Sequence, residues 1–142
     1  MGQRLSHVAV TVPRAQLVGP PREALLDFYA SVFGWRENPR LAIPGERIFL
    51  RAPSDTQYLT IRASDSPMQG SGAEHVGIVV GSEAELREIH ARAAAMRERF
   101  PDLELEAVRA EYGGSLLTFR VRFRLPVSIE VQCLGTPDPE RP

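Results

Sequence analysis

The chain has 142 residues and a formal net charge of −1, from 17 basic and 18 acidic side chains. This length suits a single domain that folds without a stabilising disulfide or zinc ion. The near-neutral charge gives no electrostatic reason to expect nucleic acid or a membrane surface as a partner. Lysine is absent, which excludes Schiff-base and phosphate-loop lysine chemistry, and the single cysteine, Cys133, suits a reducing compartment. With no signal-peptide core and no apolar run long enough to span a bilayer, we expect a soluble, cytoplasmic protein.

The first half of the chain predicts a strand, a helix and further strands. The sequence HVAVTV at residues 7–12 is rich in β-branched residues, as buried strands are. A helix follows, because apolar side chains recur at helical spacing up to Gly34, which suits the left-handed position after a helix. These apolar positions are Leu25, Phe28, Tyr29, Val32 and Phe33. Strand-like runs then occupy residues 35–43, 47–51 and 58–62, with a turn signal at 53–55.

The second half repeats this order. HVAVTV recurs as HVGIVV at residues 75–80. Ser82 and Glu85 form a capping-box pattern at the start of a helix whose apolar face runs to Phe100, and Pro101 stops it. Strand-like runs follow at 103–111, 116–123 and 127–133.

The repeat defines the domain organisation. A polar linker at residues 64–72 separates module 1, about residues 4–63, from module 2, about residues 73–134, and a polar tail covers residues 135–142. Neither module is large enough to bury its sheet face alone. We therefore predict an α+β fold in which two βαβββ modules form one pseudo-symmetric domain over residues 1–142.

Two of the three histidines occupy equivalent places in the repeat. Because side chains alternate along a strand, His7 and His75 both lie on the sheet face away from the helices. Glu130 lies inside the apolar strand VSIEVQ, where a buried carboxylate needs a partner or a metal. The residues alone leave other interpretations open: the histidines can be structural, and Glu130 can pair with Arg120 or Arg122.

In order along the chain, these features resemble the vicinal oxygen chelate superfamily, which holds glyoxalases, extradiol dioxygenases, and fosfomycin and bleomycin resistance proteins. The resemblance rests on HVAV at 7–10, FY at 28–29 with FGW at 33–35, HVGI at 75–78, YG at 112–113 and IEV at 129–131. In that family the two modules curl into an open barrel around a metal, with ligands on the first and last strands of each module. The resemblance therefore implies His7, His75 and Glu130 as metal ligands.

The chain departs from the family pattern at the fourth ligand position. Aligning residues 58–62 with 128–132 puts Thr60 there, where the glyoxalases use Glu or Gln, and we expect that Thr60 is not a ligand. Two histidines and one carboxylate with open positions suit Fe(II), Mn or Zn. The third histidine, His90, is expected to pack at the flank of its helix, which disfavours a ring-cleaving dioxygenase.

The resemblance implies a metal-dependent enzyme, glyoxalase-like or dioxygenase-like, that acts on a small oxygenated substrate. Isomerase, lyase, transferase and dioxygenase chemistry are not distinguished, and no catalytic acid or base is assigned. The candidate substrate-pocket residues are Tyr58, Arg62, Tyr112 and Arg120; the tyrosines either line the cavity or cover the sheet. The alternative is a metal-free, non-catalytic binding protein, similar to the bleomycin resistance members. Family members commonly dimerise, so we expect a homodimer.

Overall fold

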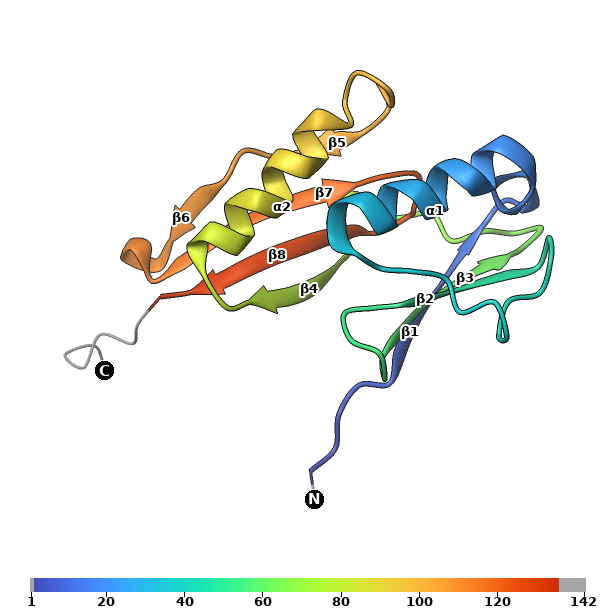
Figure 1. Cartoon of the computed structure of the whole chain (residues 1–142), viewed down its shortest axis with the longest axis horizontal. Helices are drawn as coiled ribbons and strands as arrows, with labels where there is room; N and C mark the ends of the chain where they lie inside the picture. Colours follow the sequence, from blue (N-terminus) through green and yellow to red (C-terminus); the bar gives the residue numbers. More distant parts are fainter. Residues whose placement is uncertain (1, 136–142) are drawn as a thin grey trace. The chain divides into compact units, whose positions relative to one another are not determined.

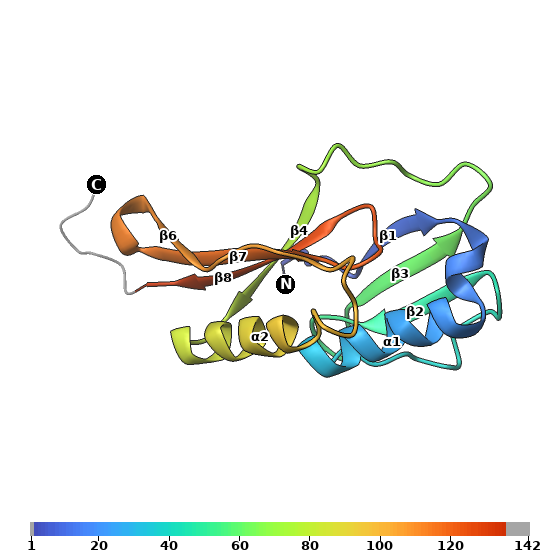
Figure 2. The ribbon, with the colours of Figure 1, turned by 90° about the horizontal axis from the view of Figure 1, so that it is seen from above.

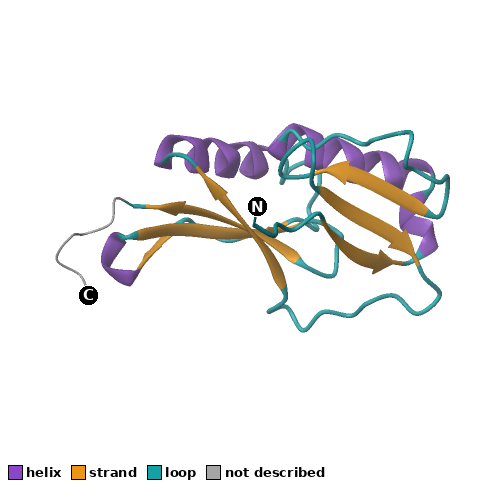
Figure 3. Ribbon diagram, turned by 90° about the horizontal axis from the view of Figure 1, so that it is seen from below, coloured by secondary structure: helices purple, strands orange, loops and turns teal. Residues whose placement is uncertain are grey.

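The computed structural model describes residues 2–135, so the predicted tail lies outside the described residues except for Gly135. The chain divides into two compact units, with the boundary between Ser71 and Gly72. The predicted linker is a loop, without helix or strand over residues 64–72 (Figure 3). That the two units form one pseudo-symmetric domain stays a prediction.

Unit 1 is a three-stranded sheet with one α-helix (Figure 1). Its elements are β1 (His7–Val12), η1 (Arg14–Leu17), α1 (Gly19–Phe33), β2 (Arg47–Arg51) and β3 (Tyr58–Ala63). The strand order is β1-β3-β2, with β1 parallel and β2 antiparallel to β3. The strands predicted at 7–12, 47–51 and 58–62 are confirmed, with β3 one residue longer.

Helix α1 begins and ends as its sequence predicts. Proline occupies the first helical turn, where a backbone N–H needs no partner within the helix. Gly34 follows the helix with φ of 75°, a left-handed conformation that glycine adopts without strain. The helix buries its apolar stripe almost completely, at Leu25, Phe28, Tyr29 and Val32.

Unit 2 is a five-stranded sheet with α2 along one face (Figure 2). Its elements are β4 (His75–Val80), α2 (Glu83–Ala95), β5 (Glu104–Leu105), β6 (Arg109–Glu111), η2 (Tyr112–Gly114), β7 (Leu116–Arg122) and β8 (Ser128–Leu134). The order is β4-β8-β7-β5, and β6 also pairs with β7. Among residues 2–135, no helix is both long and apolar enough to cross a bilayer.

Helix α2 has the predicted N-terminal cap and a shorter C-terminal end than predicted. The Ser82 hydroxyl accepts a hydrogen bond from the Glu85 backbone N–H at 3.1 Å. The helix ends at Ala95, before the predicted Phe100, because Met96 and Arg97 donate to the carbonyls three residues back and tighten the last turn. Phe100 is nevertheless buried, as its place in the apolar pattern predicts.

The prediction of a strand at residues 35–43 is wrong. This segment keeps only two isolated bridges, Glu37 with Leu50 and Ile43 with Arg47. Asn38 turns the chain instead, since its side chain accepts a hydrogen bond from the Arg40 N–H at 3.1 Å. The next residue is proline, which has no N–H to donate to a ladder. Unit 1 is therefore a βαββ unit with a bridged loop where a fourth strand was expected.

The strand predicted at residues 103–111 is present in two pieces, β5 and β6. The pairing partners shift by one residue between Leu105, which pairs with Val121, and Arg109, which pairs with Thr118. An extra residue therefore lies between the two pieces, and this is the signature of a β-bulge. Both pieces pair antiparallel with β7.

Candidate functional site

In unit 2, the parallel pairing of β4 with β8 brings a histidine and a carboxylate onto one face of the sheet. His75 pairs with Ser128, and two residues along the same face Gly77 pairs with Glu130. Ile78, on the opposite face, is buried on the side of α2. The predicted orientation of His75, away from the helix, is thus confirmed.

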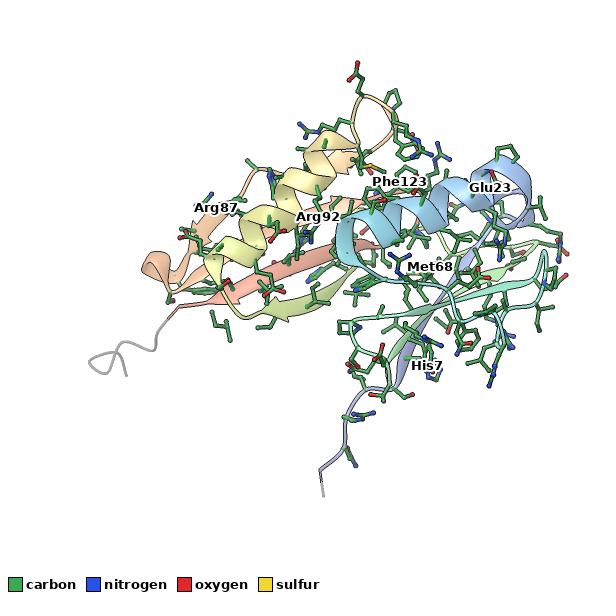
Figure 4. The ribbon with its side chains drawn as sticks, viewed as in Figure 1. His7, Glu23, Met68, Arg87, Arg92 and Phe123 are labelled. Carbon is green, nitrogen blue, oxygen red and sulfur yellow. The ribbon has the colours of Figure 1, made fainter. Side chains whose placement is uncertain are left out.

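In unit 1, the parallel pairing of β1 with β3 has the same register. His7 pairs with Tyr58, and two residues along Ala9 pairs with Thr60. Thr60 in unit 1 therefore stands where Glu130 stands in unit 2, so the predicted alignment of residues 58–62 with 128–132 is confirmed. Figure 4 shows His7 where the chain enters β1.

Glu130 is buried, and both of its carboxylate oxygens are engaged. Its Oε2 lies 3.0 Å from Nε2 of His75. Its Oε1 accepts a hydrogen bond of 2.9 Å from the hydroxyl of Thr118, a fully buried side chain on β7. The carboxylate is therefore fixed in one orientation, with one oxygen directed at the imidazole.

The other ring nitrogen of His75 decides what this pair can do. Nδ1 lies 2.8 Å from the carbonyl oxygen of Ala73, which can only accept, so Nδ1 carries the proton. In the neutral imidazole Nε2 is then an acceptor that faces a carboxylate oxygen at 3.0 Å. Two acceptors this close are favourable only with a proton or a cation between them. Metal-ligating histidines commonly donate their other ring N–H to a backbone carbonyl, as Nδ1 of His75 does to Ala73. The pair therefore fits a divalent metal.

Within the described part of the chain, no group of three or more His, Cys, Asp or Glu side chains is arranged to hold a metal ion. In unit 2 this leaves His75 and Glu130 as a pair. The predicted third ligand, His7, belongs to unit 1, where the Ser6 hydroxyl lies 2.7 Å from its Nδ1. The full set of His7, His75 and Glu130 stays a prediction.

Unit 1 holds a small cavity of about 120 Å³ at His7. The hydroxyl of Thr60 lies in its wall, buried and without a hydrogen-bond partner among the described residues. Two of the predicted pocket residues, Tyr58 and Arg62, line the same cavity. That Tyr58 and Arg62 contact a substrate stays a prediction.

Unit 2 holds a larger cavity of about 450 Å³, which Arg120 and Ser128 line. Tyr112 does not line this cavity; it lies in η2 and is 72% exposed. The positive φ values of Tyr112 and Gly113 turn the chain there, at the end of the sheet. That Tyr112 contacts a substrate stays a prediction.

His90 lies away from these groups, as predicted. Its Nε2 is 2.9 Å from the carbonyl oxygen of Glu106, and its ring meets the Phe119 ring edge-on at 4.9 Å. His90 is therefore a structural contact between α2 and the sheet.

Sequence reasoning missed Thr118 and Ser128. Thr118 alternates with apolar residues along β7, and its side chain is fully buried against Glu130. The register between β7 and β8 identifies Thr118 as a neighbour of Glu130. It pairs Arg120 with Glu130, which brings Thr118 diagonally next to Glu130. The five-residue connection at 123–127 carries no turn signature that fixes this register in advance.

No protein-family model matches the chain, and no curated protein matches its sequence. Solved structures do match. A possible glyoxalase from Bacillus cereus is 22% identical, with a TM-score of 0.65 over 93% of this chain and 100% of that one. Lactoylglutathione lyase from Agrobacterium tumefaciens is 20% identical, with a TM-score of 0.65 over 93% of this chain and 94% of that one. The fosfomycin resistance protein FosX from Listeria monocytogenes is 19% identical, with a TM-score of 0.65 over 96% of both chains.

These three structures belong to one superfamily, and each covers nearly all of both chains compared. The predicted α+β class is confirmed, and the chain has the fold of the vicinal oxygen chelate superfamily.

Proposed function

We propose that the chain is a metal-dependent enzyme of the vicinal oxygen chelate type that acts on a small oxygenated substrate. His7, His75 and Glu130 would hold one divalent metal. The observation that carries the proposal is the approach of His75 Nε2 to Glu130 Oε2 at 3.0 Å, with the other nitrogen and the other oxygen already occupied. The relatives of this fold include enzymes, such as the lactoylglutathione lyase.

The side chains of the three proposed ligands limit the choice of metal ion. Two imidazoles and one carboxylate, with further positions open, suit Fe(II), Mn(II) or Zn. A FosX structure from Listeria monocytogenes contains Mn(II), which supports a divalent ion in this fold. When bound, such an ion supplies Lewis-acid polarisation of a substrate oxygen.

The chain's own residues prepare the site in two ways. Thr118 and the Ala73 carbonyl fix the orientations of Glu130 and His75, so little freedom is lost when a ligand binds. Tyr58, Arg62 and Arg120 are proposed to contact the substrate. No side chain is assigned to move a proton, and isomerase, lyase, transferase and dioxygenase reactions stay open. With His90 held by Glu106 and Phe119, ring cleavage that needs a further histidine is the least favoured.

Metal analysis tests the proposal. Protein purified without a chelator should hold about one equivalent of metal, and H75A, E130A and H7A should each lower that content strongly. His90→Gln is the matched control, because it removes a histidine outside the proposed set and should leave the metal content unchanged. Metal below about a tenth of an equivalent, together with intact ligand binding in H7A, would instead favour a metal-free binding protein.

Localisation and assembly are proposed from the sequence. The buried free thiol of Cys133 suits the cytoplasm, since it forms no disulfide within the chain. A homodimer is proposed from the resemblance alone.

A further inference from the structure

The larger cavity of unit 2 lies on the sheet face that carries Glu130. Its walls include three arginines and two glutamates, Arg97, Arg120, Arg122, Glu104 and Glu106. Arg120 pairs in register with Glu130, and Ser128 precedes Glu130 by two residues on the same face of β8. The cavity is therefore next to the proposed metal ligands.

The two carboxylates of this cavity are already paired. Glu104 forms an ion pair with Arg122, and Glu106 forms one with Arg109. Arg97 donates to the carbonyl oxygen of Leu105 at 2.8 Å, which supplies no negative charge. Among the described residues, neither Arg97 nor Arg120 has a carboxylate partner. Neither guanidinium group is therefore held in an ion pair, although Glu130 lies opposite Arg120 on β8.

Two polar atoms in the same wall are buried without a partner. They are Nε of Arg120 and the hydroxyl oxygen of Ser128, whose residue is only 7% exposed. Burying such groups without hydrogen bonds is unfavourable, so a ligand that accepts from both would recover that loss. Arginine with a neighbouring hydroxyl is suited to an oxyanion, because the guanidinium donates in the geometry that carboxylate and phosphate oxygens accept.

We propose that this cavity binds an oxyanion group, a carboxylate or a phosphate-type group, through Arg120 and Ser128, with Arg97 adding positive charge. That the group belongs to the substrate rests on the proposed function. The enzyme would then act on a small anionic molecule whose charged end lies beside Glu130. Binding of the oxyanion itself requires no metal.

NMR titration of the full chain, treated with chelator and labelled with ¹⁵N, tests the site. Inorganic phosphate and acetate are added separately, and the Arg120 Nε–H and Ser128 backbone signals are followed. We expect saturable shifts with at least one anion and a dissociation constant of about the millimolar range. The comparison of the two anions distinguishes a phosphate-type from a carboxylate ligand.

Variants separate the site from general charge effects. R120Q should weaken anion binding about tenfold or more, S128A should weaken it less, and R120K should retain part of it. Arg87→Gln is the matched control, because Arg87 lies on α2 in an exposed pair with Glu83 (Figure 4). Non-saturating shifts, or equal affinity in R120Q and R87Q, would overturn the proposal. Because metal is absent throughout, this outcome is independent of the metal analysis.

Discussion

Thr118 is the side chain on which the orientation of Glu130 depends. Its hydroxyl donates to Oε1 at 2.9 Å inside the sheet, where no solvent can replace the bond. Thr118→Val keeps the side-chain shape and removes the donor. We expect the variant to lose about 1–3 kcal/mol of unfolding free energy, because the buried carboxylate loses a hydrogen bond. Urea denaturation measures this loss.

The same substitution should lower metal affinity about 10–100-fold, as changes to groups that orient a ligand commonly do. Calorimetric titration of the chelator-treated protein checks this effect. Thr118→Ser is the matched control, since it retains the hydroxyl and should keep most of the affinity. A valine variant that binds metal as tightly as the wild type would show that Thr118 is a structural residue only.

At the residue scale, what the sequence could predict depended on the repeat. His7 and His75 were found because two copies of one strand place them identically, and the shared register then confirmed Thr60 as the partner of Glu130 in the alignment. Thr118 was missed because it reaches Glu130 from another strand. Such diagonal contacts depend on hairpin register, which the local sequence at residues 123–127 does not specify.

At the scale of elements, one ion pair joins two turns of unit 2. Asp102, just before β5, accepts hydrogen bonds from Arg124, just after β7, at 2.8 and 3.3 Å. The hydrogen bond from Arg124 holds the pKa of Asp102 below its ordinary value of 3.8. The guanidinium also lies 4.7 Å over the Phe123 ring. The pair therefore ties the β5 entry to the β7–β8 connection.

Asp102→Asn should make stability less sensitive to acid. Because the folded-state pKa is lowered, the wild-type pair stabilises the fold above pH 3.8 and loses that effect as the pH falls through the lowered pKa. The difference between wild type and variant should be at most about 1 kcal/mol near neutral pH, since the carboxylate is half exposed, and should vanish in acid. Urea denaturation across this range measures it.

Asp65→Asn is the control for this experiment. Asp65 lies in the loop between β3 and β4, and no ion pair of its side chain is present within residues 2–135. Its removal should leave the dependence of stability on pH close to that of the wild type. A pH-independent difference between D102N and wild type would contradict the argument.

The elements that the sequence predicted correctly are those whose pattern and boundaries agree. Strands β1 and β4 combine β-branched residues with a repeated register, and α1 ends on a glycine that adopts the expected left-handed conformation. The segment at 35–43 looked like a strand from its apolar residues alone. There the Asn38 side chain competes with the ladder, and the tertiary bridge to Leu50 decides the outcome.

At the scale of the whole molecule, each unit carries its own natural probe. Trp35 is the only tryptophan and lies in unit 1, where it is 5% exposed and stacks on Phe33 at 4.5 Å. Cys133 is the only cysteine and lies in unit 2, where it is 8% exposed. Tryptophan fluorescence and thiol labelling therefore report separately on the two units.

If the two units form one domain, both probes should give the same urea midpoint. Ile61→Val, in the core of unit 1, should then lower the stability reported by both probes by about 0.5–1.5 kcal/mol. Ile129→Val in unit 2 is the matched variant and should act on both probes in the same way. A shift confined to the probe in the mutated unit would show that the units unfold independently, against the predicted single domain.

The equal registers of β1–β3 and β4–β8 also have an evolutionary consequence. The repeated module gives the chain two equivalent positions on the last strand of each sheet. Thr60 occupies one of them and Glu130 the other. The side chain at either position can change while the hydrogen-bond ladder of the other sheet stays intact. Single substitutions can therefore change the number of metal-ligating side chains. Divergence between the halves is thus a route by which one ancestral scaffold acquires new chemistry without a new backbone.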